Sequence, residues 1–183
     1  MDTGGSETLR DSSEVTNGSH SEDIVIPELF LEYIGDNGAF GVAYIPVQEL
    51  GTKSRSDSNS EGDTGTYKAE AEVANHLMIY GDLNMAEVSG ATVYGKLGLS
   101  LVDIETSESL NSGSTLPNEE RLLGWTVGIG ARGDMPYLSD SYFYKAEITY
   151  SEYDQFKKTT SGGNKIVADT DVTSAKFSIG YKY

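Results

Sequence analysis

Few residues of this chain have types and spacing suited to catalysis. Its 183 residues include two histidines, His20 and His76, and no cysteine. A nucleophilic or acid–base site needs a base within hydrogen-bond reach of its partner, and spacing assigns no serine or aspartate to either histidine. The lack of cysteine also excludes thiolate nucleophiles, disulfides and zinc–sulfur sites. The sequence therefore predicts a protein that is not an enzyme.

A glycine-rich segment could bind a dinucleotide if a helix followed it. Residues 128–133 read Gly-Ile-Gly-Ala-Arg-Gly, which is the GxGxxG pattern of such sites. That chemistry needs a helix N-terminus behind the glycines to bind the pyrophosphate, and Asp134, Met135 and Pro136 follow instead. We interpret the glycines as small residues that relieve crowding in a narrow interior, and we expect no cofactor.

One acidic segment has part of the spacing of a calcium-binding loop. From Asp57, oxygen-bearing side chains alternate and the sixth residue is Gly62. The twelfth position should supply a bidentate glutamate, but it is Lys68. We interpret residues 57–63 as a flexible acidic loop, and weak calcium binding by this loop stays open.

Most other charged residues with regular spacing lie where polar and apolar side chains alternate. In 141–154, Tyr144 and Ile148 share one face and Lys145 and Glu147 the other. A period of two is that of a β-strand with one apolar and one polar face. Seven such strands are predicted, at 24–34, 39–50, 66–80, 91–105, 121–132, 141–154 and 171–183.

The charges on the polar faces are nearly balanced, although the chain has a net charge of −16. Such balance indicates an enclosed interior where each charge is paired, with the acidic excess in loops and rims. The expected interior network consists of the carboxylates Glu28, Glu32, Glu70, Glu72 and Glu147 and the cations Lys68, Lys96, Arg132, Lys145, Lys176 and Lys182.

The apolar faces have no segment of the chain to cover them, so we expect lipid to do so. The predicted lipid-facing residues are Val93, Leu97, Leu99, Trp125, Val127, Ile129, Tyr142, Tyr144, Ile148, Tyr150, Phe177 and Ile179. At the C-terminus, aromatic and aliphatic residues recur at alternate positions up to the last residue: Phe177, Ile179, Tyr181 and Tyr183.

This ending resembles the closing strand of small bacterial outer-membrane β-barrels of the OmpA, OmpX and opacity type. In that family the alternating terminal aromatics serve as the assembly signal for the barrel-assembly machinery. The resemblance implies an all-β, antiparallel up-and-down transmembrane barrel over 24–183. It also implies a non-enzymatic protein of the bacterial outer membrane, with a role in envelope integrity or in adhesion to a surface receptor through long external loops.

The connections between the predicted strands alternate between short and long, as in outer-membrane barrels. Residues 35–38 form a tight turn, 133–140 a short connection and 81–90 one of medium length. The connections 51–65, 106–120 and 155–170 are long, and 1–23 form a polar external loop or leader. Barrels of this class have even strand numbers, so we expect an eight-stranded barrel of which this chain supplies seven strands. The first strand would be missing from the chain, leaving a gap between 24–34 and 171–183.

Two other function classes stay open from the sequence alone. A narrow porin-like channel would pass a small solute, and a soluble lipocalin-like carrier would turn the apolar faces inward around a ligand. A nucleic-acid partner is not expected, because the acidic surface repels phosphates.

Overall fold

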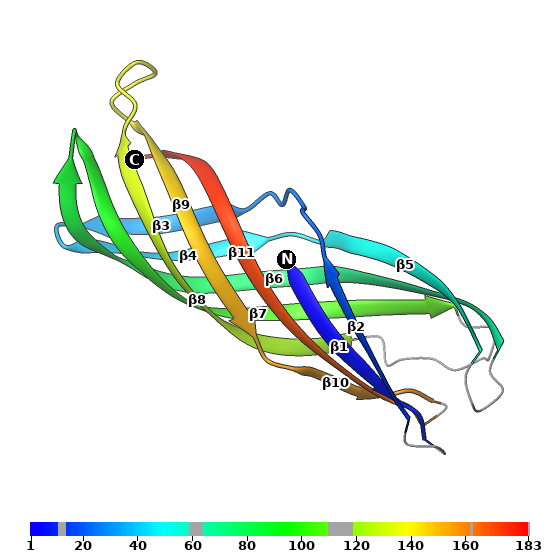
Figure 1. Cartoon of the computed structure of the whole chain (residues 1–183). Coiled ribbons are helices and arrows are strands. Elements are labelled where there is room, and N and C mark those ends of the chain that lie inside the picture. The colour runs from blue at the N-terminus through cyan, green and yellow to red at the C-terminus, as the bar shows by residue number, and fades with distance from the viewer. Residues whose placement is uncertain (11–13, 59–63, 110–118, 162, 183) are drawn as a thin grey trace.

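The computed structural model describes residues 1–10, 14–58, 64–109, 119–161 and 163–182. Within these ranges, the side chains of 49–58, 64–71, 106–109 and 119 are not described. The elements described are all β-strands joined antiparallel in one sheet (Figure 1). No helix long and apolar enough to cross a membrane occurs in the described part of the chain.

The sheet contains eleven strands. They are β1 (Asp2–Thr8), β2 (Val15–Ser21), β3 (Leu29–Gly35), β4 (Gly38–Ile45), β5 (Gln48–Ser58), β6 (Thr64–Val88), β7 (Ala91–Ser109), β8 (Glu119–Asp134), β9 (Tyr142–Tyr153), β10 (Phe156–Thr159) and β11 (Lys165–Tyr181). Their order is β2-β1-β11-β9-β8-β7-β6-β4-β3, with β10 also on β11 and β5 also on β6.

The predicted antiparallel, up-and-down, all-β fold is confirmed. The unbroken path from β3 to β11 holds one strand for each of the seven predicted segments. Strands form there because β-branched and aromatic residues fill one face of each segment and pack well on a pleated surface. Within the described residues the sheet does not close into a ring, since β2 and β3 end the path.

Several predicted connections are wrong because strands continue through them. Strand β6 runs on to Val88, so 81–90 is not a loop. It ends in a two-residue turn at Ser89 and Gly90, both with positive φ, as the tightest hairpins require. The long connections expected at 51–65 and 155–170 contain most of β5 and all of β10.

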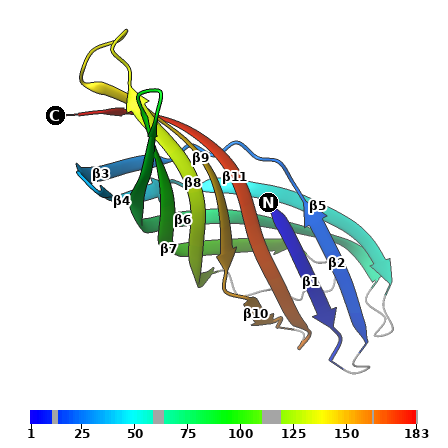
Figure 2. The same cartoon turned by 60° about the vertical axis from the view of Figure 1, so that its left-hand side comes forward.

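Residues 1–23 were expected to form a polar external loop or leader, and most of the described ones lie in two strands. Asp2–Thr8 and Val15–Ser21 form the β1–β2 hairpin, and β1 pairs with the first part of β11, from Asp2 opposite Asp171 to Thr8 opposite Lys165. Figure 2 shows this hairpin beside β11. Glycine, serine and threonine here give no alternating pattern, so pairing to β11 rather than strand propensity fixes the conformation.

The short turns lie together at one end of the sheet. Two residues, Asp36 and Asn37, connect β3 to β4, and Ser89 and Gly90 connect β6 to β7. In Figure 1 these turns, the β8–β9 connection and the C-terminus lie toward the upper left, and the opposite ends of β5 to β7 extend far to the right. We call these the turn end and the extended end.

Candidate functional site

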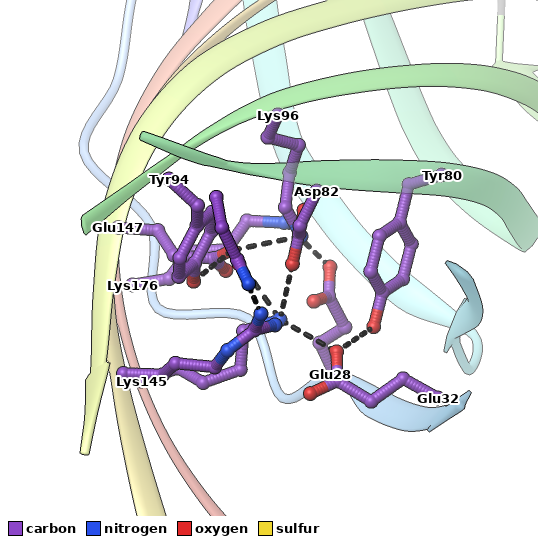
Figure 3. Close-up of polar contacts among 11 residues, drawn as sticks. Glu28, Glu32, Tyr80, Asp82, Tyr94, Lys96, Lys145, Glu147 and Lys176 are labelled. Carbon is purple, nitrogen blue, oxygen red and sulfur yellow. Dashed lines mark hydrogen bonds and ion pairs between the residues drawn. The ribbon is translucent and has the colours of Figure 1, made fainter. Parts of the chain in front are cut away.

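The inner face of the sheet carries a cluster of buried ionised side chains from four strands. Lys145 and Glu147 come from β9, Lys96 from β7, Asp82 from β6 and Glu32 from β3. Their side chains are at most 4% exposed. We call these five residues the interior charge cluster (Figure 3).

Each lysine of the interior charge cluster contacts more than one carboxylate. The Lys145 Nζ atom lies 2.7 Å from Glu32 Oε2, 3.0 Å from Asp82 Oδ2 and 3.6 Å from Glu147 Oε1. The Lys96 Nζ atom lies 2.7 Å from Glu147 Oε1 and 3.5 Å from Asp82 Oδ1. Shared partners of this kind offset the cost of removing each charge from water.

Two tyrosines donate hydrogen bonds to carboxylates of the interior charge cluster. Tyr80 donates a hydrogen bond of 2.8 Å to Glu32, and Tyr94 donates one of 2.8 Å to Glu147. The Lys96 ammonium also lies 3.6 Å from the centre of the Tyr80 ring, a favourable cation–π distance. The phenols therefore hold both cations and carboxylates in fixed positions.

Glycines on neighbouring strands make room for these rings. A Cβ atom at Gly130 would lie 2.6 Å from Tyr94 Cζ, and one at Gly41 would lie 2.5 Å from Tyr80 Cζ. Real Cβ atoms do not approach other atoms so closely, so each tyrosine can cross its neighbouring strand only where that strand has glycine. Segment 128–133 lies within β8, with no helix behind it, and its glycines relieve crowding inside the sheet.

Other predicted members of the network lie elsewhere. Lys176 of β11 pairs with Glu28 at 2.6 Å, in the same region of the interior in Figure 3. Arg132 is buried, donates a hydrogen bond to Asn84 and lies 5.3 Å from the Tyr94 ring centre. These residues adjoin the interior charge cluster without a direct ion pair to it in the described structure.

The prediction of one network is wrong for two residues. Lys182 pairs with Asp134 at the exposed turn end. Glu72 lies beyond an irregularity at Ala74, where the β6–β7 register shifts between Val73 and Asn75. Such a bulge reverses which side chains face inward, and Val73 packs against the buried cluster of Val102, Leu122 and Phe156. The side chains of Lys68 and Glu70 lie outside the described residues.

Asp82 is the member of the interior charge cluster that the sequence prediction missed. Its segment was predicted as part of the connection 81–90, and glycine and aspartate are residues that turns favour. An alternating pattern nonetheless extends through this segment. One face consists of His76, Met78, Tyr80 and Asp82, and the other of Leu77, Ile79, Gly81 and Leu83. The face that contains Asp82 is buried.

The interior beyond the interior charge cluster is also occupied. Toward the extended end, Thr126 bonds Ser151 and Thr149 bonds Ser174 through their hydroxyls, at 2.8 and 2.6 Å. His76 lies 3.1 Å from the Tyr153 hydroxyl. Val102, Leu122 and Phe156 form an apolar group at the same end. Among the described residues, no cluster of three or more His, Cys, Asp and Glu side chains could hold a metal ion.

The outer face of the same strands is apolar and exposed. Leu97, Leu99 and Phe177 are 69, 63 and 69% exposed. Of the predicted lipid-facing set, Trp125, Val127, Ile129, Tyr142, Ile148 and Ile179 are also exposed, whereas Val93, Tyr144 and Tyr150 are half-buried. In the predicted assembly signal, Phe177, Ile179 and Tyr181 share this exposed face, and Tyr183 lies outside the described residues.

An outward-facing ion pair ends this apolar surface toward the extended end. Leu97, Leu99 and Leu101 of β7 lie opposite Val127, Trp125 and Leu123 of β8. The next outward pair is Asp103 with Arg121, 2.7 Å apart. The hydrogen bond from Arg121 holds the pKa of the Asp103 carboxyl below its usual value. The outer apolar surface therefore has a sharp border.

No known protein family's sequence profile matches this chain, and no curated protein matches it.

Proposed function

We propose that this protein is an outer-membrane β-barrel protein that spans the bacterial outer membrane with the strands from β3 to β11. The observation that carries the proposal is that charged residues are buried inside the sheet and apolar residues are exposed on its outside. Lys96, Lys145 and Glu147 are buried inside the sheet, while Leu97, Leu99 and Ile148 are exposed outside it. Soluble proteins rarely expose large contiguous apolar surfaces, and lipid would cover this one.

The height of the apolar surface supports the same proposal. On β7 it runs from Val93 to Leu101 and ends at the Asp103–Arg121 pair. A tilted strand needs about 9 to 11 residues to cross the hydrocarbon core, which this segment supplies. Strands β6 and β7 continue well past the border, to Thr64 and Ser109.

We assign a non-enzymatic role to the protein: it anchors an extended sheet at the bacterial surface, where it contributes to envelope integrity or adhesion. The extended ends of β5, β6 and β7 and the β1–β2 hairpin would form the external part, and a surface receptor would bind there. Insertion would require outer-membrane lipid and the barrel-assembly machinery, with the terminal strand as the assembly signal.

The other two function classes fit the arrangement less well. A lipocalin-like carrier needs an apolar interior, and here the interior holds the charges. A channel needs an open interior, and the interior charge cluster, the paired hydroxyls and the apolar group at Phe156 occupy the described one.

The single tryptophan tests the membrane proposal directly. Trp125 is 44% exposed on the apolar face and is the only tryptophan in the chain. After refolding into vesicles, its emission should shift to shorter wavelength and be quenched by lipids brominated on their acyl chains. A matched control, Trp125→Phe with Tyr137→Trp, moves the fluorophore to the β8–β9 turn, where Tyr137 is fully exposed. That variant should escape quenching. Equal quenching of both proteins, or of neither, would refute the proposed orientation.

A further inference from the structure

Two strand edges at opposite ends of the path from β3 to β11, which the curl of the sheet brings near each other, have no strand beside them in the described structure. Strand β3 pairs with β4 alone. Beyond Asp171, strand β11 pairs with β9 alone. We call the two edges, Leu29–Gly35 and Val172–Tyr181, the seam. Their backbone N–H and C=O groups are available to a further strand.

The directions of the two edges exclude the simplest closure. Every neighbouring pair on the path from β3 to β11 is antiparallel, and this path contains seven strands. With an odd number, β3 and β11 run in the same direction. They cannot pair with each other in an antiparallel sheet, whereas one strand running opposite to both would pair with each edge.

The seam is also narrow enough for one strand. The Lys176 ammonium on β11 reaches Glu28, which directly precedes β3, at 2.6 Å. Two strands that flank a third are about 9.5 Å apart, a separation that a lysine and a glutamate side chain can bridge together. Phe30 of β3 and Phe143 of β9 also meet, with ring centres 6.2 Å apart.

Strand β1 points into the seam. It is antiparallel to β11, and its register ends with Asp2 opposite Asp171. If β1 were extended toward its N-terminus in the same register, the added residues would lie beside Val172–Tyr181. On its other side β1 pairs with β2, which precedes β3 in the chain.

We propose that the seam is a strand-binding site, and that its occupant is an extended segment that enters in line with β1. Its outward side chains would be apolar, to match Phe177, Ile179 and Leu31 on the two edges. Its inward side chains would be small or hydroxyl-bearing, because Lys176 and Glu28 already occupy the interior there. The proposal depends on the sheet and not on lipid, so detergent suffices to test it.

The test adds a designed strand of about ten residues ahead of Met1. Apolar residues are placed opposite Thr173, Ala175, Phe177, Ile179 and Tyr181, and Ser, Thr or Gly opposite the residues between. A matched control has the same residues shifted by one position, which reverses its two faces. Hydrogen–deuterium exchange is then measured in detergent on the parent chain and both variants.

The in-phase strand should slow exchange at the edge-facing amides of both Leu29–Gly35 and Val172–Tyr181 by about tenfold or more. The shifted strand should leave them as in the parent, and all three proteins should sediment as monomers. Unchanged exchange with the in-phase strand would overturn the proposal. Slow exchange at both edges in the parent chain would also overturn it. If that parent is a dimer, a second copy is the occupant of the seam. If it is a monomer, the chain itself covers the edges. Tryptophan quenching by lipid is independent of all these outcomes.

Discussion

At the scale of single residues, the interior is organised by shared partners and not by isolated ion pairs. Asp82 and Glu147 each contact both lysines of the interior charge cluster, and Glu32 binds Lys145 and the Tyr80 hydroxyl. Removal of one member therefore affects several others, and mutations within the cluster should not be additive.

Lys145→Met should show this dependence most clearly. Without the ammonium, Glu32 and Asp82 lose their closest cation, and we expect the free energy of unfolding to fall by about 3–5 kcal/mol. Urea titration in detergent, followed by Trp125 fluorescence, measures the loss. Lys182→Met removes an exposed partner of Asp134 and should cost about 1 kcal/mol or less. Similar losses for the two variants would contradict the assigned role of the buried cluster.

Gly130→Ala tests the close approach of a strand to a tyrosine ring. The new methyl group would lie 2.6 Å from Tyr94 Cζ, and Tyr94 is completely buried. We expect a loss of about 1–3 kcal/mol from overpacking, measured by the same titration. Gly95→Ala is the matched control, because its nearest atom is Met85 Sδ at 3.6 Å. In a Tyr94→Leu background the added cost of Gly130→Ala should fall, and the part that remains should come from Glu147, whose Cγ atom would lie 2.9 Å from the new methyl group.

At the scale of strands, the sequence predicts the elements well where one face is apolar throughout. The alternation over 91–105, 121–132 and 141–154 identifies β7, β8 and β9. It fails at Ala74, because nothing in the residue types announces a bulge that turns Val73 inward and Glu72 away from the interior. It also fails for β1 and β2, whose polar residues take strand form through pairing with β11.

The candidate site was predictable in its members but not in its contacts. Lys96, Lys145, Glu147 and Glu32 are identifiable as residues of polar faces by the period of two. Which carboxylate meets which lysine depends on register between strands and on how far the sheet curls, and neither property is encoded in the spacing along one strand. Asp82 was missed because its segment was predicted as part of the connection 81–90.

The border of the apolar surface gives a prediction at this scale. Arg121 should hold the pKa of Asp103 below its usual value of 3.8, and Arg121→Gln should return it toward that value. Carbon-detected NMR titration measures the pKa of Asp103 in the parent chain and in the Arg121→Gln variant. Because the ionised Asp103 carboxyl is favoured in the folded state, the pair contributes to the stability of the fold at pH values above the pKa of Asp103 in the unfolded chain. That contribution is lost as pH falls through the lower folded pKa. The effect on stability should be small, since the pair is exposed, and a raised pKa would contradict the pairing.

At the scale of the whole molecule, contacts across the interior show how strongly the sheet curls. Lys145 of β9 reaches Glu32 of β3, although β8, β7, β6 and β4 lie between these strands in the sheet. A flat sheet would keep these side chains far apart. The interior is therefore wrapped by the strands and filled by their own side chains, as expected when about eight strands enclose a space.

This filled interior predicts that the protein does not conduct ions. In planar bilayers the parent chain should give no discrete conductance steps. Lys96→Ala combined with Glu147→Ala removes two opposite charges and their volume together, and steps that appear only in this variant would show that the interior charge cluster obstructs the path. Regular steps from the parent chain would instead favour the channel function.

The pairing of β1 with β11 has a consequence for the order of folding. On the main path, each strand from β3 to β9 pairs with a strand close to it in the sequence, whereas Asp2 must meet Asp171. The free-energy cost of loop closure rises by only about 0.6 kcal/mol for each doubling of loop length. The long closure between β1 and β11 therefore lowers stability little, but it forms slowly. We expect the hairpins to form first and the pairing of β1 with β11 to form last. Since β1 is synthesised before β11, its edge would stay unpaired until β11 has been made.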